Sequence, residues 1–429
     1  MEWALAVIAL ALIAVAAVSR RLSGTPVTAA MVFVAIGVLV GPRFLDGIDV
    51  ESSSSTVRTL AEATLALVLF SDASRINLGE LRREASVPAR LLGLGLPLTI
   101  VIGAAVALLL FGQITFWEAA ILGIILAPTD AALGQAVVTE PKVPGRIRQG
   151  LNVESGLNDG ICVPLLFAAV AAADVESHIA GGRDAGTLLA QEIGYGILGG
   201  IIAGFLIGMV IREAGRRDLI SGPWKQVVPA AGAALAYGIA SALGGSGFIA
   251  AFVGGIAFRA LLGRDPEDLN RFTDEIGDVL NGVTFIVFGA ILLGPALGEI
   301  TWEAALYALL SLTLVRMIPV AVAMLGSGAR KQTVSFLGWF GPRGLASIVF
   351  AVIVLEESSL PHEQVLLPVI YLTVGLSVFA HGITAAPLAN RYGKWSRNNP
   401  APEAESVESV GADGVVTRLR HPLPGRGGD

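Results

Sequence analysis

Two carboxylates stand out because they lie in an otherwise apolar stretch, QGLNVESGLNDGICVPLLF, at residues 149–167. Glu154 and Asp159 are five positions apart, and Ser155 and Asn158 accompany them. A fixed charge at the centre of a bilayer costs on the order of 3 kcal/mol by insertion scales. A membrane segment that keeps such groups uses them to bind an ion, to carry a proton or to pair with another buried charge.

Asp159 is the residue that we expect to bind a transported ion. Ser155 precedes it by four positions and so lies on the same face of a helix. A carboxylate in a poorly solvated cavity holds either a proton or a small cation, and oxygen ligands suit a hard cation. Thr129, in an interrupted helix, can add a hydroxyl and free backbone carbonyls. Competition between proton and metal ion at Asp159 is then an exchange mechanism. A structural, capping role for Asp159 is the alternative.

We single out five other charged residues that fall within apolar segments. Asp130 is expected where a half-helix begins, and we favour a structural role there over direct ligation. Glu154 and Arg316 are expected to form a buried ion pair between two helices. Asp72 is a possible accessory group near an inner mouth, and Arg343 is expected to face the carbonyl ends of half-helices.

The composition places these residues in a membrane protein. The chain has 429 residues, of which 54% are apolar and 15% charged, and its mean hydropathy is +0.72. Soluble domains carry roughly 25% charged residues. The single cysteine, Cys162, excludes an intrachain disulfide. The four histidines are too scattered along the chain to form a metal site: His178, His362, His381 and His421. We expect a lipid bilayer as partner, and we expect neither a cofactor nor a nucleic acid.

Apolar stretches long enough to be transmembrane helices recur along the chain. The thirteen expected spans are 2–19, 25–41, 57–73, 87–111, 116–137, 150–173, 186–211, 224–243, 246–263, 275–294, 302–325, 334–355 and 363–387. The first is interpreted as an uncleaved helix, because a signal peptide begins with positive charge and this one does not. Residues 1–393 thus form a membrane transport domain, and 394–429 a cytoplasmic, disordered tail.

Arginine and lysine are concentrated in every second connection between spans, and this distribution predicts how the chain is oriented in the membrane. If Arg20 and Arg21 are cytoplasmic, the inner connections hold 21 such residues and the outer loops hold only Arg43 and Arg183. The positive-inside rule then places the N-terminus outside and the C-terminus in the cytoplasm.

The spans also suggest an internal symmetry. Spans 1–6 and 8–13 form two units offset by an odd number of helices, which gives an inverted repeat. The fifth span of each unit is interrupted, at LAPTDAALG (residues 126–134) and at WFGPRGLAS (residues 339–347). In transporters built from inverted repeats, the binding site lies at such broken helices.

Five stretches occur in one order along the chain: APTD (127–130), ESGLNDG (154–160), GGSGFIAAFVGGIAF (244–258), GPRGLAS (341–347) and TVGLSVFAHGITAAPL (373–388). Together they resemble the cation:proton antiporter-1 family, the NhaP-like sodium/proton antiporters related to animal exchangers. The resemblance implies thirteen helices in an inverted repeat, with crossed, discontinuous helices 5 and 12. It also implies a homodimer and an elevator-like movement of the core.

The resemblance assigns roles to individual residues. It casts Asp159 as the ion- and proton-binding carboxylate, with Asn158 as its neutral partner and Thr129 and Ser155 as ligands. Glu154 with Arg316 matches the structural charge pair of the family. Two departures are visible: Gly156 stands where leucine is common, and Pro342 replaces the usual residue before the arginine.

The expected function is therefore secondary transport: exchange of Na⁺, and of Li⁺, for H⁺ across a prokaryotic plasma membrane. Because Asn158 is neutral, we expect one-for-one, electroneutral exchange. K⁺/H⁺ exchange on the same scaffold is the first alternative. An intramembrane aspartyl protease would need Asp130 and Asp159 to share a water in a different motif context, and a passive channel fits broken helices less well.

Overall fold

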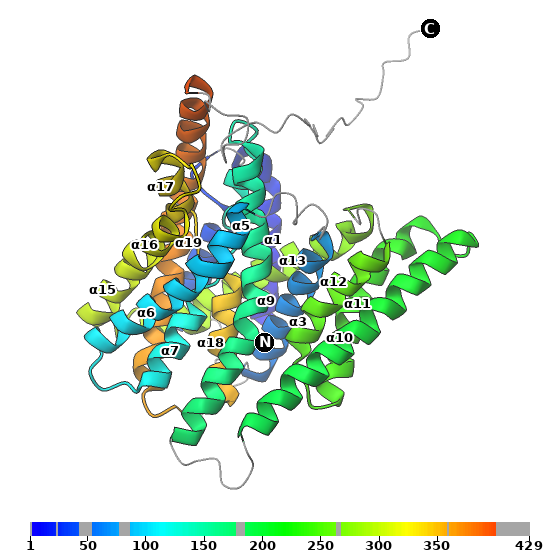
Figure 1. Ribbon diagram of the computed structural model, residues 1–429, viewed down its shortest axis with the longest axis horizontal. Helices are drawn as coiled ribbons and strands as arrows, with labels where there is room; N and C mark the ends of the chain where they lie inside the picture. Colours follow the sequence, from blue (N-terminus) through cyan, green and yellow to red (C-terminus); the bar gives the residue numbers. More distant parts are fainter. Residues whose placement is uncertain are drawn as a thin grey trace.

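The structure, a computed structural model, describes residues 2–22, 25–42, 54–76, 86–176, 185–262, 267–357 and 360–399. Over these ranges the chain is helical, with turns and extended connections and no strand (Figure 1). Arg43, Arg183, His178, His421 and the tail from residue 400 lie outside the described residues.

The helices follow one another with short connections. The first half holds α1 (Glu2–Leu22), α2 (Ala29–Val40), α3 (Ser54–Arg75), α5 (Ser86–Arg90), the π-helical turn η1 (Leu91–Gly95), α6 (Leu96–Leu110), α7 (Phe116–Ile125), α8 (Gln135–Val138) and α9 (Gly145–Glu176). The second half holds α10 (Ala185–Arg216), α11 (Gly222–Ala242), α12 (Gly247–Leu262), α13 (Glu267–Val287), η2 (Phe288–Leu293), α14 (Gly294–Ala296), α15 (Trp302–Leu312), α16 (Leu314–Ala323), α17 (Lys331–Trp339), α18 (Leu345–Glu357) and α19 (Glu363–Asn398).

Each expected span coincides with a helix or a broken helix. Within the described residues, seven helices are long and apolar enough to cross a membrane, judged by length and composition. Two differences from the sequence prediction are clear. Helix α19 continues to Asn398, past both the expected span end at 387 and the domain boundary at 393. The span predicted at 302–325 is interrupted at Thr313, where the backbone leaves helical geometry (φ −114°, ψ −92°).

The helices form two groups with α9 between them (Figure 1). Helices α10, α11 and α12 pack with α3 and α13 in one group. Helices α6 and α7 pack together in the other, where α15 and α18 lie against α19 and α16 lies against α17. Helix α9 contacts α3, α10 and α12 on one side and α5, α7 and α18 on the other. Its side chains can therefore be reached from both groups.

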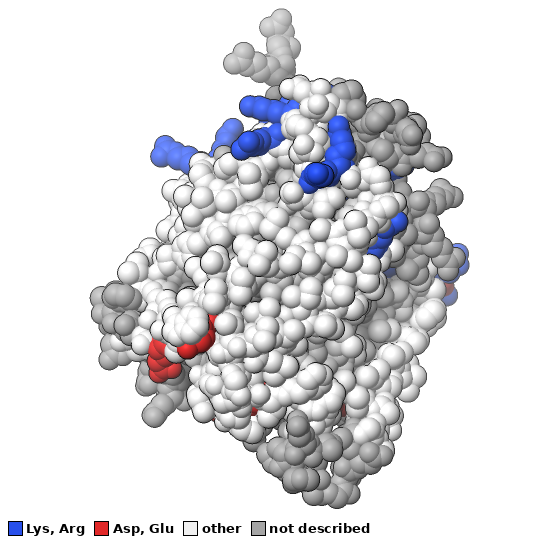
Figure 2. All heavy atoms as spheres, turned by 60° about the vertical axis from the view of Figure 1, so that its left-hand side comes forward, with Lys and Arg blue, Asp and Glu red and all other residues white. Residues whose placement is uncertain are grey.

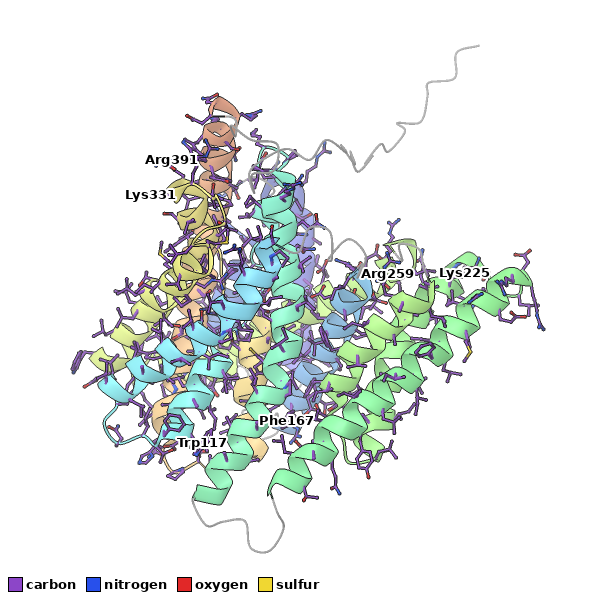
Figure 3. The ribbon with its side chains drawn as sticks, viewed as in Figure 1. Trp117, Phe167, Lys225, Arg259, Lys331 and Arg391 are labelled. Atoms are coloured by element: carbon purple, nitrogen blue, oxygen red, sulfur yellow. The ribbon has the colours of Figure 1, made fainter. Side chains whose placement is uncertain are left out.

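The charged residues are separated along the molecule. On the face shown in Figure 2, lysine and arginine gather at one end and acidic residues lie towards the other, with an uncharged belt between them. Figure 3 places Lys331 and Arg391 at that first end, which we call the basic end, and Lys225 and Arg259 at the upper ends of their own helices, while Trp117 lies towards the other end. Many large apolar side chains in the belt are exposed, as expected where lipid replaces water.

Local sequence explains the two broken helices. Thr115 and Glu118 form a capping box that starts α7, and the helix ends at Ile125 ahead of Pro128. Helix α17 ends at Trp339, ahead of Pro342. Proline has no backbone N–H and restricts the residue before it, so neither helix continues through its break.

Candidate functional site

The two breaks lie against each other. The backbone N–H of Asp130 donates to the Pro342 carbonyl at 2.7 Å. In return, the Leu345 N–H donates to Oδ2 of Asp130 at 2.9 Å. The Ser347 hydroxyl donates to the Ile125 carbonyl at 2.7 Å, close to the end of α7. Backbone groups freed by one break are thus satisfied by the other, as buried polar groups require.

Asp130 caps two helical segments at once. Its Oδ1 accepts from Ala132 N at 2.8 Å and from Leu133 N at 3.3 Å, while its Oδ2 serves the first turn of α18. A Cβ at Gly344 would overlap Oδ2 of Asp130, so only glycine leaves room for this approach. The negative charge faces the positive ends of both segments. Asp130 thus makes contacts of the structural kind that we favoured for it.

Helix α9 holds Thr129 from the opposite side. The Ser155 hydroxyl donates to the Thr129 carbonyl. Asn158 Nδ2 donates to Oγ1 of Thr129 at 2.8 Å. All three side chains are at most 6% exposed. The unwound segment and α9 therefore present several oxygens within one buried region.

Asp159 lies beside this arrangement with an oxygen that has no partner. The residue is 9% exposed, and its Oδ1 makes no hydrogen bond within the described residues. Oδ1 of Asn158 is likewise buried without a partner. An unsatisfied buried carboxylate is costly unless it takes up a proton or a cation. Asp159 is therefore the group in this region with free capacity for either.

The ligand chemistry points to a weakly held hard cation. The described residues contain no cluster of three or more His, Cys, Asp or Glu side chains that could hold a metal ion. The available groups are one carboxylate with hydroxyl, amide and backbone oxygens, which suit an alkali cation better than a transition metal.

A cavity of about 270 Å³, counting space open to solvent, adjoins the two breaks. Its lining includes Thr129, Asp130, Ser155, Phe340 and Pro342. Asp159 and Asn158 do not line it. The cavity therefore reaches Thr129 and Ser155 but not Asp159.

Glu154 and Arg316 form a buried ion pair between α9 and α16. Nη1 of Arg316 lies 2.6 Å from Oε1 of Glu154, and Nη2 donates to Oε2 at 2.9 Å. Both residues are 1% exposed. The two parallel contacts match the planar guanidinium to the carboxylate, which fixes the orientation of one helix against the other.

Arg343 is fully buried and only partly satisfied. Its Nη1 donates to the Gly341 carbonyl at 2.9 Å, and its backbone N–H donates to the Ser377 hydroxyl at 2.6 Å. Its Nε and Nη2 have no partner within the described residues. The carbonyl that it contacts lies in the break itself. His381 joins the same region through Ser377 and the Trp339 carbonyl, at 3.0–3.1 Å.

Asp72 approaches α9 at Gly156. A Cβ built on Gly156 would lie 3.4 Å from Cβ of Asp72, so a leucine at this position would extend into the Asp72 side chain. Asp72 is close enough to Arg75, Asp274 and Asp130 to interact electrostatically. The departure from the family pattern at Gly156 therefore makes room for Asp72 beside the site.

The sequence interpretation missed two polar features. Glu118 is fully buried and accepts from the backbone N–H of His362 at 2.9 Å; its second oxygen lies 2.9 Å from Nδ1 of His362. Helix α13 also carries acidic and amide residues along one face, including Asp278. The polar face of α13 could have been recognised from the sequence DEIGDVLN at residues 274–281. It was missed because the expected span began at residue 275, within this stretch.

Comparison with known proteins supplies independent information. The transmembrane sodium/hydrogen exchanger family matches residues 7–391. A K⁺/H⁺ antiporter NhaP2 of Shewanella oneidensis is 26% identical over 387 residues, which cover 86% of this chain and 64% of the relative. A Na⁺/H⁺ antiporter of Schizosaccharomyces pombe is 26% identical over 313 residues, covering 66% of each chain. The chain thus spans less than two thirds of the length of these relatives.

Solved structures show the same fold. The sodium proton antiporter MjNhaP1 of Methanocaldococcus jannaschii, in a structure at pH 8, superposes with a TM-score of 0.69 at 20% identity. The match covers 92% of this chain and 99% of that one. A second MjNhaP1 structure, from electron microscopy, gives a TM-score of 0.75 at 18% identity, with 94% and 100% covered. The all-helical NhaP-type fold is therefore confirmed, whereas the crossing of the broken helices and the inverted repeat stay predictions.

Proposed function

Since the family match runs over most of the chain, the protein belongs to the sodium/hydrogen exchanger family, and we propose that it exchanges Na⁺, and also Li⁺, for H⁺. Members of this family are secondary transporters rather than enzymes. The protease alternative finds no support in the geometry, because both carboxylate oxygens of Asp130 accept backbone hydrogen bonds.

The observation that carries the proposal is the unpartnered Oδ1 of Asp159 beside the oxygens of Thr129 and Ser155. A cation bound there takes oxygens from these residues and from the free Oδ1 of Asn158. A proton bound to Asp159 removes the charge that attracts the cation. The cation and the proton therefore displace each other at Asp159, and no further residue is needed to couple their transport.

The neighbouring charges have supporting roles in this proposal. Asp130 holds the two breaks together, and Glu154 with Arg316 fixes α9 against α16. Asp72 is an accessory carboxylate that raises the local cation concentration. Because Asn158 is neutral and Asp130 is already satisfied by backbone N–H groups, one charge alternates at the site. Exchange is then one H⁺ for one cation and electroneutral.

K⁺/H⁺ exchange is the second candidate. It is favoured by the names of relatives, since the Shewanella proteins are K⁺/H⁺ antiporters. The fission-yeast and Zygosaccharomyces relatives are Na⁺/H⁺ antiporters at similar identity. The candidate ligand oxygens alone do not distinguish Na⁺ from K⁺, because the same oxygens bind either ion.

We place the protein in a prokaryotic plasma membrane as a homodimer, with the N-terminus outside and the basic end and tail in the cytoplasm. The topology assigns Lys225, Arg259, Lys331 and Arg391 to one side, and Figure 3 supports this by placing each of them towards the upper end of its helix, away from Trp117. No bound cofactor is part of the proposal.

The test is dissipation of a pH gradient in proteoliposomes that contain the purified full-length protein. Na⁺, Li⁺ and K⁺ are added separately as chloride salts, with choline chloride as the control. Dissipation by Na⁺ and Li⁺ but not choline supports the proposal, dissipation by K⁺ alone supports the second candidate, and no response to any cation refutes both.

A further inference from the structure

Helix α13 carries a stripe of polar residues that faces α3. Apart from the adjacent Thr273 and Asp274, successive members are three or four positions apart, so they lie on one side of the helix: Asn270, Thr273, Asp274, Asp278 and Asn281. Asn270 Nδ2 donates to the Ser74 hydroxyl, and the Ser71 hydroxyl donates to Oδ1 of Asp274 at 2.6 Å. We call these five α13 residues the polar seam.

Three oxygens of the polar seam are buried without a hydrogen-bond partner within the described residues. They are Oδ1 of Asn270, Oγ1 of Thr273 and Oδ1 of Asn281. Asn270 and Thr273 are themselves 0% and 1% exposed. Asn270 and Asp274 contact the same turn of α3, through Ser74 and Ser71, so the Asn270 side chain lies near the Asp274 carboxylate. Buried oxygens of this kind bind water or a cation.

Asp278 shows that water reaches the polar seam. It is exposed although it belongs to the apolar span Leu269–Ala296. It lies three positions beyond Glu275, whose exposed side chain pairs with Arg271 at 3.0 Å, so it is about one helical turn further along α13 than that pair. Within the described residues, no hydrogen bond or ion pair satisfies its carboxylate. An exposed charged side chain next to a membrane span faces water rather than lipid.

The acids of the polar seam connect electrostatically to the ion site. Asp278 lies within interaction range of Asp274, and Asp274 within range of Asp72. Asp72 in turn interacts with Asp159. The one cation among them is Arg75, which is ion-paired with Asp274. Three carboxylates and one guanidinium leave a net negative path that leads to Asp159.

We propose that the polar seam is a staging site, where Asp278 and Asp274 hold a partly hydrated monovalent cation before it reaches Asp159. The neighbouring amide and hydroxyl oxygens replace part of its water shell. Arg75 neutralises one carboxylate and so keeps the cation from being held too tightly to move on. This inference rests on the proposed function, because the staged ion is the one that Asp159 exchanges.

The test compares Asp278→Asn with two matched variants in full-length protein in proteoliposomes. Asp278→Glu keeps the charge. Glu213→Gln removes the same charge from an exposed position on α10, where Glu213 pairs with Arg217 at 2.6 Å. The Na⁺ concentration for half-maximal exchange is measured at about 10 mM and at about 1 M ionic strength, adjusted with choline chloride, because the screening length falls about tenfold between them.

We expect Asp278→Asn to raise the half-maximal Na⁺ concentration by about threefold or more at low ionic strength. The maximal rate stays unchanged, and the difference disappears at high ionic strength. Asp278→Glu and Glu213→Gln behave as wild type. An unchanged Asp278→Asn, an equal shift in Glu213→Gln, or a shift that does not depend on ionic strength overturns the staging site. Wild-type protein that exchanges no alkali cation refutes the proposed function and this inference with it.

Discussion

Asp159 combines burial with an oxygen that the described residues do not satisfy, and this sets it apart from the acids around it. Both oxygens of Asp130 and of Glu154 have partners. The Thr129 hydroxyl and carbonyl each accept one hydrogen bond from α9, which leaves a lone pair on each oxygen for an ion. The candidate site therefore has one unsatisfied carboxylate oxygen together with neutral oxygens of Thr129.

Replacing Asp159 with asparagine should abolish exchange. The amide keeps the shape of the side chain but can neither ionise nor release a proton. We expect no cation-dependent pH-gradient dissipation, while the variant still inserts and elutes as a single species from size-exclusion chromatography. Glu275→Gln is the matched loss of one charge and should retain full activity. Exchange at wild-type rates in Asp159→Asn would remove this residue from its role.

At the residue scale, the sequence indicated the site residues because ionisable groups within apolar segments are few. The spacing of Ser155 and Asp159 put them on one helix face, and the partners of Thr129 lie on that same helix. The sequence did not indicate which oxygens would be left free, since this depends on how the two breaks fold against α9. Asp278 was missed because it lies near a predicted span end.

The two broken helices act as one element because each completes the hydrogen bonds of the other. Asp130 is the centre of this joint, and Gly344 allows its approach to the N-terminus of α18. The hydrogen bonds between the two breaks therefore depend on Gly344, although this glycine is not among the candidate ion ligands.

Gly344→Ala should separate the two breaks. The added Cβ overlaps Oδ2 of Asp130, so the first turn of α18 must shift and buried N–H groups lose their acceptor, at about 1–3 kcal/mol each. We expect a lower unfolding temperature in detergent and a loss of most exchange activity. Gly238→Ala on α11 has no atom within 4 Å of its Cβ and should be neutral or slightly stabilising. Equal behaviour of the two variants would contradict the joint.

The Glu154–Arg316 ion pair leads to a second prediction at the element scale, which concerns the stability of the contact between α9 and α16. Glu154→Gln leaves the buried guanidinium unpaired and should destabilise the protein by about 3–5 kcal/mol, as should Arg316→Met. Combining both changes removes both charges, so we expect the double variant to be more stable than either single variant. Thermal unfolding of the four proteins measures this. Additive losses in the double variant would show that the pair does not act as a unit.

At the element scale, proline and glycine predicted both breaks, and each span expected from the apolar pattern overlaps a helix in the described ranges. The break at Thr313 was not predicted, because no glycine or proline marks it. The contact between Glu118 and His362 was also missed, since nothing in the sequence brings the start of α7 to the start of α19.

On the face shown in Figure 2, basic residues gather at one end and acidic residues lie towards the other, with an uncharged belt between them. This arrangement is what a positive-inside topology produces. The length of α19 exceeded the prediction because its last turns are polar, and apolar pattern alone cannot show where such a helix ends.

Electroneutral exchange is the prediction that belongs to the whole molecule. With one H⁺ exchanged for one cation, an imposed voltage does no net work on the cycle. We expect a potassium diffusion potential set with valinomycin to leave the rate of Na⁺-driven pH change unaltered in proteoliposomes without a starting pH gradient. Transport driven by voltage alone would contradict this stoichiometry.

The most direct test of competition at Asp159 is proton release on cation binding. Purified full-length protein in weakly buffered detergent solution is titrated with NaCl, and released protons are followed with a pH indicator, with choline chloride and Asp159→Asn as controls. We predict about one proton released per Na⁺ bound by wild type and none in either control. If sodium binds and no proton is released at every pH tested between about 5 and about 9, competition at Asp159 is contradicted.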